Sequence, residues 1–281
     1  MAIQQIKEKL NRHQHYLNQD PNNANLMLTV RLLKAQLLHH EQNLDEAITL
    51  LETLRIDYPM NADVIGLLAL IYFDNNQLEQ AEQFAKAALS IEPNQYEGLL
   101  VQMLLRALEQ NTTPDEINTL IQRNPQDSRL WFALGAAELR LINIPKALDA
   151  FFHATTIWPD FYDSWIYAGW CQLLQNQLAE AKLSFEKALN ISEQEAEAWG
   201  GLALISALNN HQSDAKKELE KCLARDPTCF LATMTQMILA NPSNVDETIK
   251  QFKILFPDME QEITLLLNST LSLNTNNHVV H

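Results

Sequence analysis

Hydrophobic residues recur at helical spacing along most of the chain, in pairs of stripes separated by short polar breaks. Residues 196–227 contain one such pair, with the polar break at 209–212. The first stripe consists of Trp199, Leu202, Ala203 and Ser206, and the second of Ala215, Leu219, Cys222 and Leu223. Because residues at i, i+3, i+4 and i+7 share one face of a helix, the pattern predicts two amphipathic helices.

These helix pairs repeat with a fixed period. Trp131, Trp165 and Trp199 are spaced by 34 residues and then by 34 again. Alanine and proline keep a similar step, at Ala47, Ala81, Ala147, Ala181 and Ala215 and at Pro59, Pro93, Pro125, Pro159 and Pro227. Proline cannot continue a helix, so each proline is expected to close one pair. A period of this length predicts stacked helix pairs.

The repeat resembles the tetratricopeptide repeat family. That family has an aromatic residue at position 4, Leu-Gly at 7–8, alanine at 20 and 27, an aromatic residue at 24 and proline at 32. With Ser128 as position 1, the matching residues are Trp131, Leu134, Gly135, Ala147, Phe151, Ala154 and Pro159. The next repeat supplies Trp165, Ala168, Gly169, Ala181, Phe185 and Ala188, with Glu193 in place of the proline.

The resemblance implies an all-α fold. We expect an α-solenoid, a right-handed superhelix of about six to seven helix-turn-helix repeats, with capping helices at both ends that cover the apolar end faces. The N-terminal cap is expected in 1–23, the solenoid in 24–257, the C-terminal cap in 258–273 and a disordered tail in 274–281. The repeats are expected near 24–59, 62–93, 96–125, 128–159, 162–193, 196–227 and 230–257.

Two repeats depart from the period in ways that predict local structure. Thirty-eight residues separate Pro21 from Pro59, so the first helix there is expected to be about one turn longer than the others. Only 32 residues separate Pro93 from Pro125. In that repeat, Thr113 to Glu116 reads as a capping box with proline at the first helical position, which predicts a short second helix.

The chain has only six glycines in 281 residues, well below the usual share. They are Gly66, Gly98, Gly135, Gly169, Gly200 and Gly201, and all fall in expected first helices. Gly135 and Gly169 stand at position 8, where a missing side chain lets helices approach closely. Gly66, Gly200 and Gly201 are expected to face or flank the groove and to leave room for the backbone of a ligand.

Charge and cysteine usage indicate the setting. The formal net charge is −15, and no third of the chain is basic, so nucleic acid is not expected as a partner. The longest weakly polar runs are about ten residues, too short for membrane insertion as a helix. The first residues show no signal-peptide pattern, and the three cysteines have no disulfide or metal-finger spacing. We therefore expect a cytoplasmic protein.

No catalytic constellation is evident, so we do not expect an enzyme. The chain lacks GxGxxG, GxxxxGK[ST], HExxH and GxSxG. The close histidine pairs are His13/His15 and His39/His40, whose spacings point to different faces of a helix. Neither a metal nor a cofactor is expected.

The resemblance places the partner-binding surface on the concave face, which the first helix of each repeat lines. The candidate residues are Leu33, Leu70, Phe73, Leu104, Arg129, Phe132, Ala136, Arg140, Tyr167, Trp170 and Leu204. This set is mostly apolar and lacks the Lys, Asn and Arg with which some family members grip acidic C-terminal tails. If the superhelix is tightly curved or another helix fills the groove, the same leucines are ordinary core.

The expected function is a non-catalytic scaffold or chaperone-like adaptor that captures an apolar or amphipathic segment of a protein partner. Phe132, Tyr167 and Trp170 would anchor that segment, and Arg129 and Arg140 would orient acidic flanks. An alternative is a self-associating assembly subunit that forms a homodimer through the apolar segment Ile263–Leu271. Proteins of this architecture serve unrelated processes, so the pattern does not identify the partner.

Overall fold

The computed structural model of the chain describes residues 3–240, and every regular element in that range is an α-helix. Contacts divide the chain into two compact units, with the boundary in the sequence between Thr112 and Thr113. The predicted all-α solenoid fold is confirmed. The expected helix at 258–273 and the tail at 274–281 lie outside the described residues.

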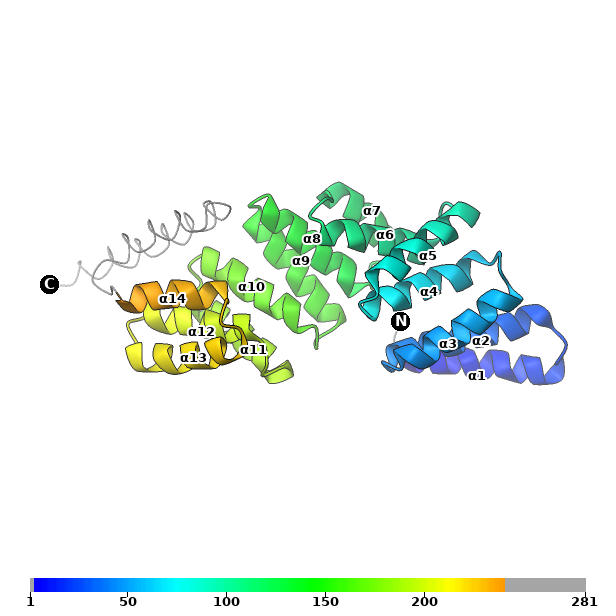
Figure 1. Cartoon of the computed structure of the whole chain (residues 1–281), viewed down its shortest axis with the longest axis horizontal. Helices are drawn as coiled ribbons and strands as arrows, with labels where there is room; N and C mark the ends of the chain where they lie inside the picture. Colours follow the sequence, from blue (N-terminus) through cyan, green and yellow to red (C-terminus); the bar gives the residue numbers. More distant parts are fainter. Residues whose placement is uncertain (1–2, 241–281) are drawn as a thin grey trace. The chain divides into compact units, whose positions relative to one another are not determined.

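The first unit contains six helices in antiparallel neighbouring pairs (Figure 1). They are α1 (Ile3–Gln19), α2 (Ala24–His40), α3 (Leu44–Asp57), α4 (Ala62–Asp74), α5 (Leu78–Ile91) and α6 (Tyr96–Leu108). Helix α1 packs against α2, in the place where the N-terminal cap was expected. Helix α2 has 17 residues against 13 in α4, so the expected extra turn is present.

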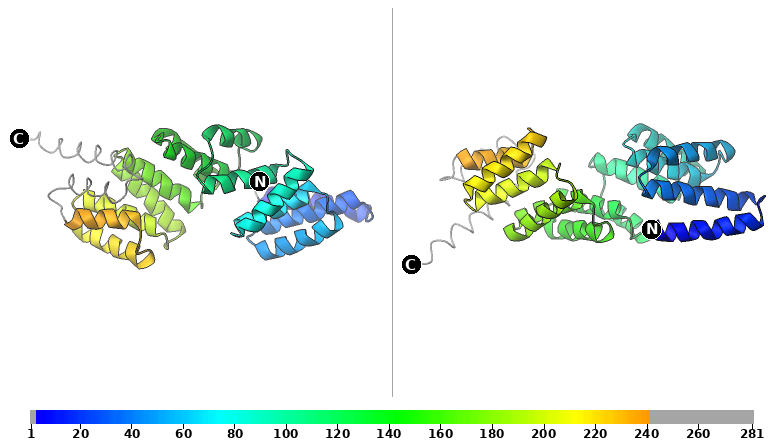
Figure 2. Two further views of the ribbon diagram at one scale, coloured as in Figure 1. Left: turned by 45° about the horizontal axis from the view of Figure 1, so that its top comes forward. Right: turned by 90° about the horizontal axis from the view of Figure 1, so that it is seen from below.

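The described part of the second unit contains eight helices, whose pairing is also visible from two further directions (Figure 2). They are α7 (Pro114–Arg123), α8 (Ser128–Arg140), α9 (Ile144–Ile157), α10 (Tyr162–Leu174), α11 (Leu178–Ile191), α12 (Ala196–Leu208), α13 (Gln212–Arg225) and α14 (Phe230–Ala240). Helix α7 begins with the predicted capping box between Thr113 and Glu116 and has 10 residues. It is shorter than the 14-residue second helices on either side of it.

Large rings at position 24 and glycines at position 8 explain how close the helices lie. An added Cβ at Gly135 would lie 2.6 Å from the Phe151 ring, and one at Gly169 would lie 2.9 Å from the Phe185 ring. Both phenylalanines are fully buried. A glycine therefore lies opposite each ring, where no side chain would fit. This confirms the predicted close-packing role of these two glycines.

The turns that follow the first helix of each repeat use no glycine. The residue with positive φ is an amide in five of the six turns, and a β-branched isoleucine in the sixth: Gln42, Asn76, Gln110, Asn176, Asn210 and Ile142. Asparagine tolerates this left-handed conformation better than most residues. The helix-only placement of all six glycines is thus confirmed.

The phased tryptophans fix each first helix of the second unit to the loop before it. The indole Nε1 of Trp131 and of Trp165 donates a hydrogen bond to the carbonyl oxygen of Pro125 and Pro159, at 2.9 Å in each case. Trp199 makes the same bond to Glu193 at 3.1 Å. The acceptor is a backbone carbonyl, so replacement of the proline by Glu193 leaves the contact intact.

Candidate functional site

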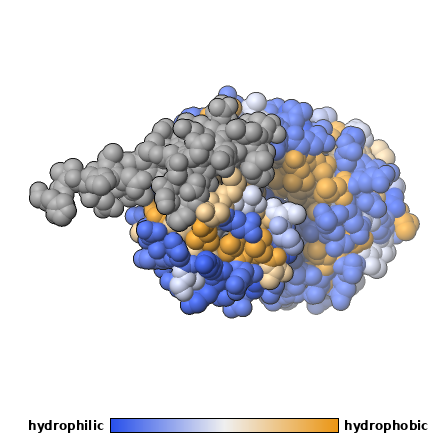
Figure 3. All heavy atoms as spheres, turned by 60° about the vertical axis from the view of Figure 1, so that its left-hand side comes forward, coloured by the Kyte–Doolittle hydropathy of each residue, from blue (hydrophilic) through white to orange (hydrophobic). Residues whose placement is uncertain are grey.

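A pocket opens in the second unit between α10, α12 and the segment that leads into α14. It encloses about 610 Å³, within the range of small-ligand sites. We call it the acidic aromatic pocket and define it by Asp163, Tyr167, Trp170, Glu195, Glu197 and Phe230. Figure 3 turns the α10–α14 side of the molecule forward and shows apolar surface bordered by hydrophilic residues.

The aromatic wall brings together three residues that the sequence predicted as anchors. Tyr167, 40% exposed, meets the Phe132 ring edge-on with centroids 5.4 Å apart. Trp170 lies further along α10 and meets Phe230 edge-on at 5.9 Å. The Tyr167 ring also lies 5.4 Å from the buried ring of Phe151, and this contact anchors one side of Tyr167 in the core. Edge-on packing of this kind fixes the rings while leaving part of Tyr167 in contact with solvent.

The acidic side of the pocket is formed by residues next to or inside the first helices. Burial first, and then the neighbouring charges of Glu195 and Glu197, together raise the pKa of Asp163 to about 6. The pKa of Tyr167 is also raised, by burial first and then by Asp163 and Glu197. A hollow that already carries several negative charges disfavours any further negative charge.

Four of the predicted groove leucines belong to the core. Leu33, Leu70, Leu104 and Leu204 are 9%, 6%, 7% and 1% exposed, so a partner could not reach them without displacing neighbouring helices. They follow the alternative reading in which groove leucines are ordinary core. Phe73 and Ala136 are half-buried.

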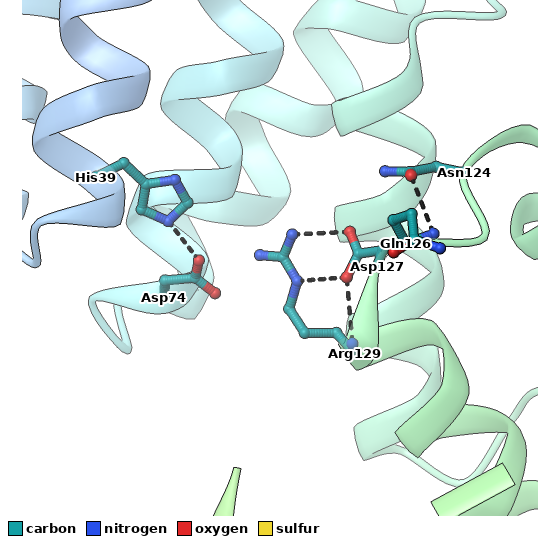
Figure 4. A network of polar contacts seen from close by, with 6 residues as sticks. All are labelled: His39, Asp74, Asn124, Gln126, Asp127 and Arg129. Atoms are coloured by element: carbon teal, nitrogen blue, oxygen red, sulfur yellow. Dashed lines mark hydrogen bonds and ion pairs between the residues drawn. The ribbon is translucent and has the colours of Figure 1, made fainter. Parts of the chain in front are cut away.

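The two predicted arginines differ from each other. Arg140 is exposed. Arg129 points its guanidinium at the residue that precedes its own helix: Nε and Nη2 donate to the two carboxylate oxygens of Asp127 at 2.9 and 2.8 Å (Figure 4). A bidentate pair of this kind is strong, and Asp127 is only 7% exposed. The charge of Arg129 is therefore engaged within the chain.

The prediction that Gly66, Gly200 and Gly201 leave room for a ligand's backbone is wrong. An added Cβ at Gly66 would lie 2.2 Å from the side chain of Gln95, and one at Gly201 would lie 2.4 Å from the Phe185 ring. At Gly200 the neighbours are Leu231 and the sulfur atoms of Cys229 and Cys222. The chain's own side chains fill all three spaces.

The acidic half of the pocket was not among the residues predicted from the sequence, although the repeat pattern contains it. Asp163 and Glu197 occupy position 2 of consecutive repeats, the same position as Arg129. Glu195 stands directly before helix α12. Phe230 begins α14 and carried no signal beyond its aromatic ring.

The histidine pairs show no sign of a metal site. His39 lies in the last turn of α2, and its Nε2 is 2.6 Å from Oδ2 of Asp74 at the end of α4 (Figure 4). Across residues 3–240, no three His, Cys, Asp or Glu side chains are grouped so that they could hold a metal ion. Cys171, Cys222 and Cys229 are buried and unbridged. The helices in this range include none with the length and hydropathy needed to span a bilayer.

Residues 38–108 match the family model described as tetratricopeptide repeat. A chain in the crystal structure of the APC/C hetero-tetramer Cut9-Hcn1 superimposes with a TM-score of 0.62 at 14% identity, over 83% of this chain and 52% of that one. The class is therefore a helical-repeat solenoid. The predicted resemblance to the tetratricopeptide repeat family is confirmed by the family model over residues 38–108 and by the fold.

Similarity to curated proteins is partial in length. A DnaJ homolog subfamily C member 7 homolog of Dictyostelium discoideum is 22% identical over 240 residues, which are 79% of this chain and 43% of that protein. The peroxisomal targeting signal receptor of Komagataella phaffii is 40% identical over 62 residues, 22% of this chain and 11% of the receptor. The chain thus spans less than half the length of either relative.

Proposed function

We propose that this protein is a scaffold or chaperone-like adaptor that captures an apolar or amphipathic segment of a partner protein along the first helices of its second unit. Its fold is that of proteins which generally act as non-catalytic adaptors. The observation that carries the proposal is the partly exposed aromatic wall formed by Phe132, Tyr167 and Trp170. Large aromatic side chains dominate the binding energy of protein interfaces more often than leucine does.

The pocket beside this wall supplies the space into which a partner's side chain could bury. Burial of apolar surface contributes about 25 cal/mol per Å² before the cost of ordering the segment. The similarity to a protein named as a receptor for a targeting signal supports a recognition role of the same kind. Arg140, which is exposed at the end of α8, is the predicted arginine that would orient an acidic flank of that segment.

A site-specific photo-crosslink tests the proposal in the native cell. A photoreactive phenylalanine analogue replaces Tyr167, and a matched variant carries it at Leu183, which is 59% exposed on α11 and outside the pocket. We expect the Tyr167 position to crosslink to one defined apolar segment of a partner, and the Leu183 position not to do so. Trp170→Ala and Phe132→Ala, with the fold checked by circular dichroism, should reduce the Tyr167 crosslink at least fivefold. Equal crosslinking from both positions, or an unchanged crosslink in the folded variants, would contradict the proposal.

A further inference from the structure

Among the described residues that line the acidic aromatic pocket, none carries a basic counter-charge. Carboxylates from Asp163, Glu195, Glu197 and Asp226 line it, and no lysine or arginine is among the lining residues. Asp226 and Glu195 are each held by a neighbour: Asp226 accepts from the Thr228 hydroxyl at 2.7 Å, and Glu195 accepts from the Ser192 hydroxyl at 2.7 Å. Neither hydroxyl carries a charge, so the site remains strongly negative.

Asp163 and Glu197 have still less compensation. Within residues 3–240, neither carboxylate accepts a hydrogen bond or pairs with a cation, and each stands at position 2 of its repeat. Position 2 of the preceding repeat holds Arg129 instead, and its charge is neutralised by Asp127. Asp163 is partly buried and Glu197 is exposed. The charge of Glu197 acts on Asp163, and like charges destabilise one another most where one of them is partly buried, so an external cation gains more here than on an open surface.

The aromatic rings of the pocket are also suited to binding a cation. A cation over an aromatic face is attracted by the ring quadrupole, most strongly over tryptophan. The described part of the second unit already contains such contacts: Lys187 Nζ lies 4.1 Å from the Trp165 centroid, and Lys221 Nζ lies 3.9 Å from that of Trp199. The guanidinium carbon of Arg225 also lies 5.7 Å from the Trp199 centroid. In each case the repeat provides its own basic residue for the tryptophan at position 4. Trp170, at position 9, has no basic residue beside it among the pocket lining.

We infer that the acidic aromatic pocket binds a lysine or arginine side chain of the partner segment, between the carboxylates of Asp163 and Glu197 and the rings of Tyr167 and Trp170. This inference rests on the proposed function and narrows it to segments that combine a basic residue with apolar neighbours. The carboxylates do not converge as metal ligands do within the described chain, whereas an elongated basic side chain can meet them and the rings at once.

The test is a selection from random 12-residue peptides displayed on phage, performed on the full-length chain. We expect peptides recovered by the wild-type protein to share a lysine or arginine next to apolar residues. The double variant Asp163→Asn, Glu197→Gln should lose this shared basic position. Because the protein is acidic overall, the matched control Asp149→Asn, Glu220→Gln removes two exposed charges outside the pocket and should keep it.

A recovered peptide then gives the size of the effect. Replacing its basic residue by citrulline or norleucine, which keep the length and remove the charge, should weaken binding to the wild-type protein about tenfold and to the double variant less than twofold. Recovery of apolar peptides without a basic residue, or a basic preference that the double variant keeps, overturns the inference while the groove proposal stands. Peptides that bind Phe132→Ala and Trp170→Ala as well as the wild type overturn both.

Discussion

Gln95 in the first unit and Glu195 in the second occupy equivalent places, each directly before the first helix of a repeat. Gln95 is 2% exposed: its Oε1 accepts from the Gly98 amide at 2.6 Å, and its side chain fills the space beside Gly66. Glu195 makes no side-chain cap for α12 and instead lines the pocket. A neutral amide can be buried when it is hydrogen-bonded, whereas a carboxylate needs a charged partner or water. The residue directly before the first helix therefore fills a buried space in the first unit, where it is Gln95. In the second unit, where it is Glu195, it lines an open pocket.

The largest effect is expected from filling the space behind the pocket. Gly201→Ala places a methyl group 2.4 Å from the Phe185 ring, which is fully buried and also contacts Gly169. The ring has to shift, so we expect a loss of about 2 kcal/mol in the free energy of unfolding, typical of overpacking. Urea unfolding followed by circular dichroism measures it.

Gly98→Ala in the first unit is the matched control. Its nearest neighbours would be 3.2–3.3 Å away, so the smaller clash is set against the higher helix propensity of alanine. We expect a change of less than about 1 kcal/mol. If Gly201→Ala proved as stable as the wild type, the Phe185 ring would be free to move toward the pocket and the wall would not be rigid.

The second expected effect compares the two residues before the helices directly. Gln95→Ala removes a cap and a buried side chain together, so we expect a loss of about 1.5 kcal/mol. Glu195→Ala removes neither, so its unfolding free energy should change by less than about 0.5 kcal/mol. The same denaturation experiment reads out both variants. Equal costs would mean that Glu195 supports the fold as Gln95 does, and that the contrast between the units is not a matter of capping.

The sequence predicted the features that the period governs. The helix pairs, the longer α2, the capping box of α7 and the approach of Gly135 and Gly169 to neighbouring rings all depend on residues that recur in phase. Phe132, Tyr167 and Trp170 could also be placed together, because they stand on the first helices of adjacent repeats. In these cases position in the repeat determines the neighbours.

The filling of the groove could not be predicted in the same way. Gln95 enters the space beside Gly66 through its side-chain conformation, and Leu231 reaches Gly200 from a helix two elements further along the chain. These contacts depend on the shape of the packed repeats and not on spacing. Asp163 and Glu197 could have been placed near the groove from their position 2 in the repeat. Their role as a negatively charged site, however, depends on the lack of a basic residue among the described lining of the folded pocket.

The smallest expected effect on stability comes from Asp163→Asn. This variant separates the effect of the Asp163 carboxylate on folding from its effect on binding. Because the folded-state pKa of Asp163 is about 6, above its ordinary 3.8, the folded chain binds more protons than the unfolded chain between about pH 4 and pH 6. The free energy of unfolding therefore rises as the pH falls through 6 and Asp163 takes up a proton, whereas the ionised carboxylate of Asp163 destabilises the fold at pH 7. Asp163→Asn should raise the unfolding free energy at pH 7 by up to about 1 kcal/mol, a figure reduced because the side chain is partly solvated. The gain should vanish at pH 4.

The exposed residue Asp149 provides the control, and Asp149→Asn should change stability little at either pH. The same Asp163→Asn variant should bind basic peptides more weakly, and the wild type should lose affinity for them below pH 6 as Asp163 takes up a proton. A carboxylate that weakens the fold at neutral pH and strengthens binding is expected at a recognition site, because there its cost is offset only when the ligand arrives. A loss of both stability and binding in Asp163→Asn would instead make Asp163 a structural residue.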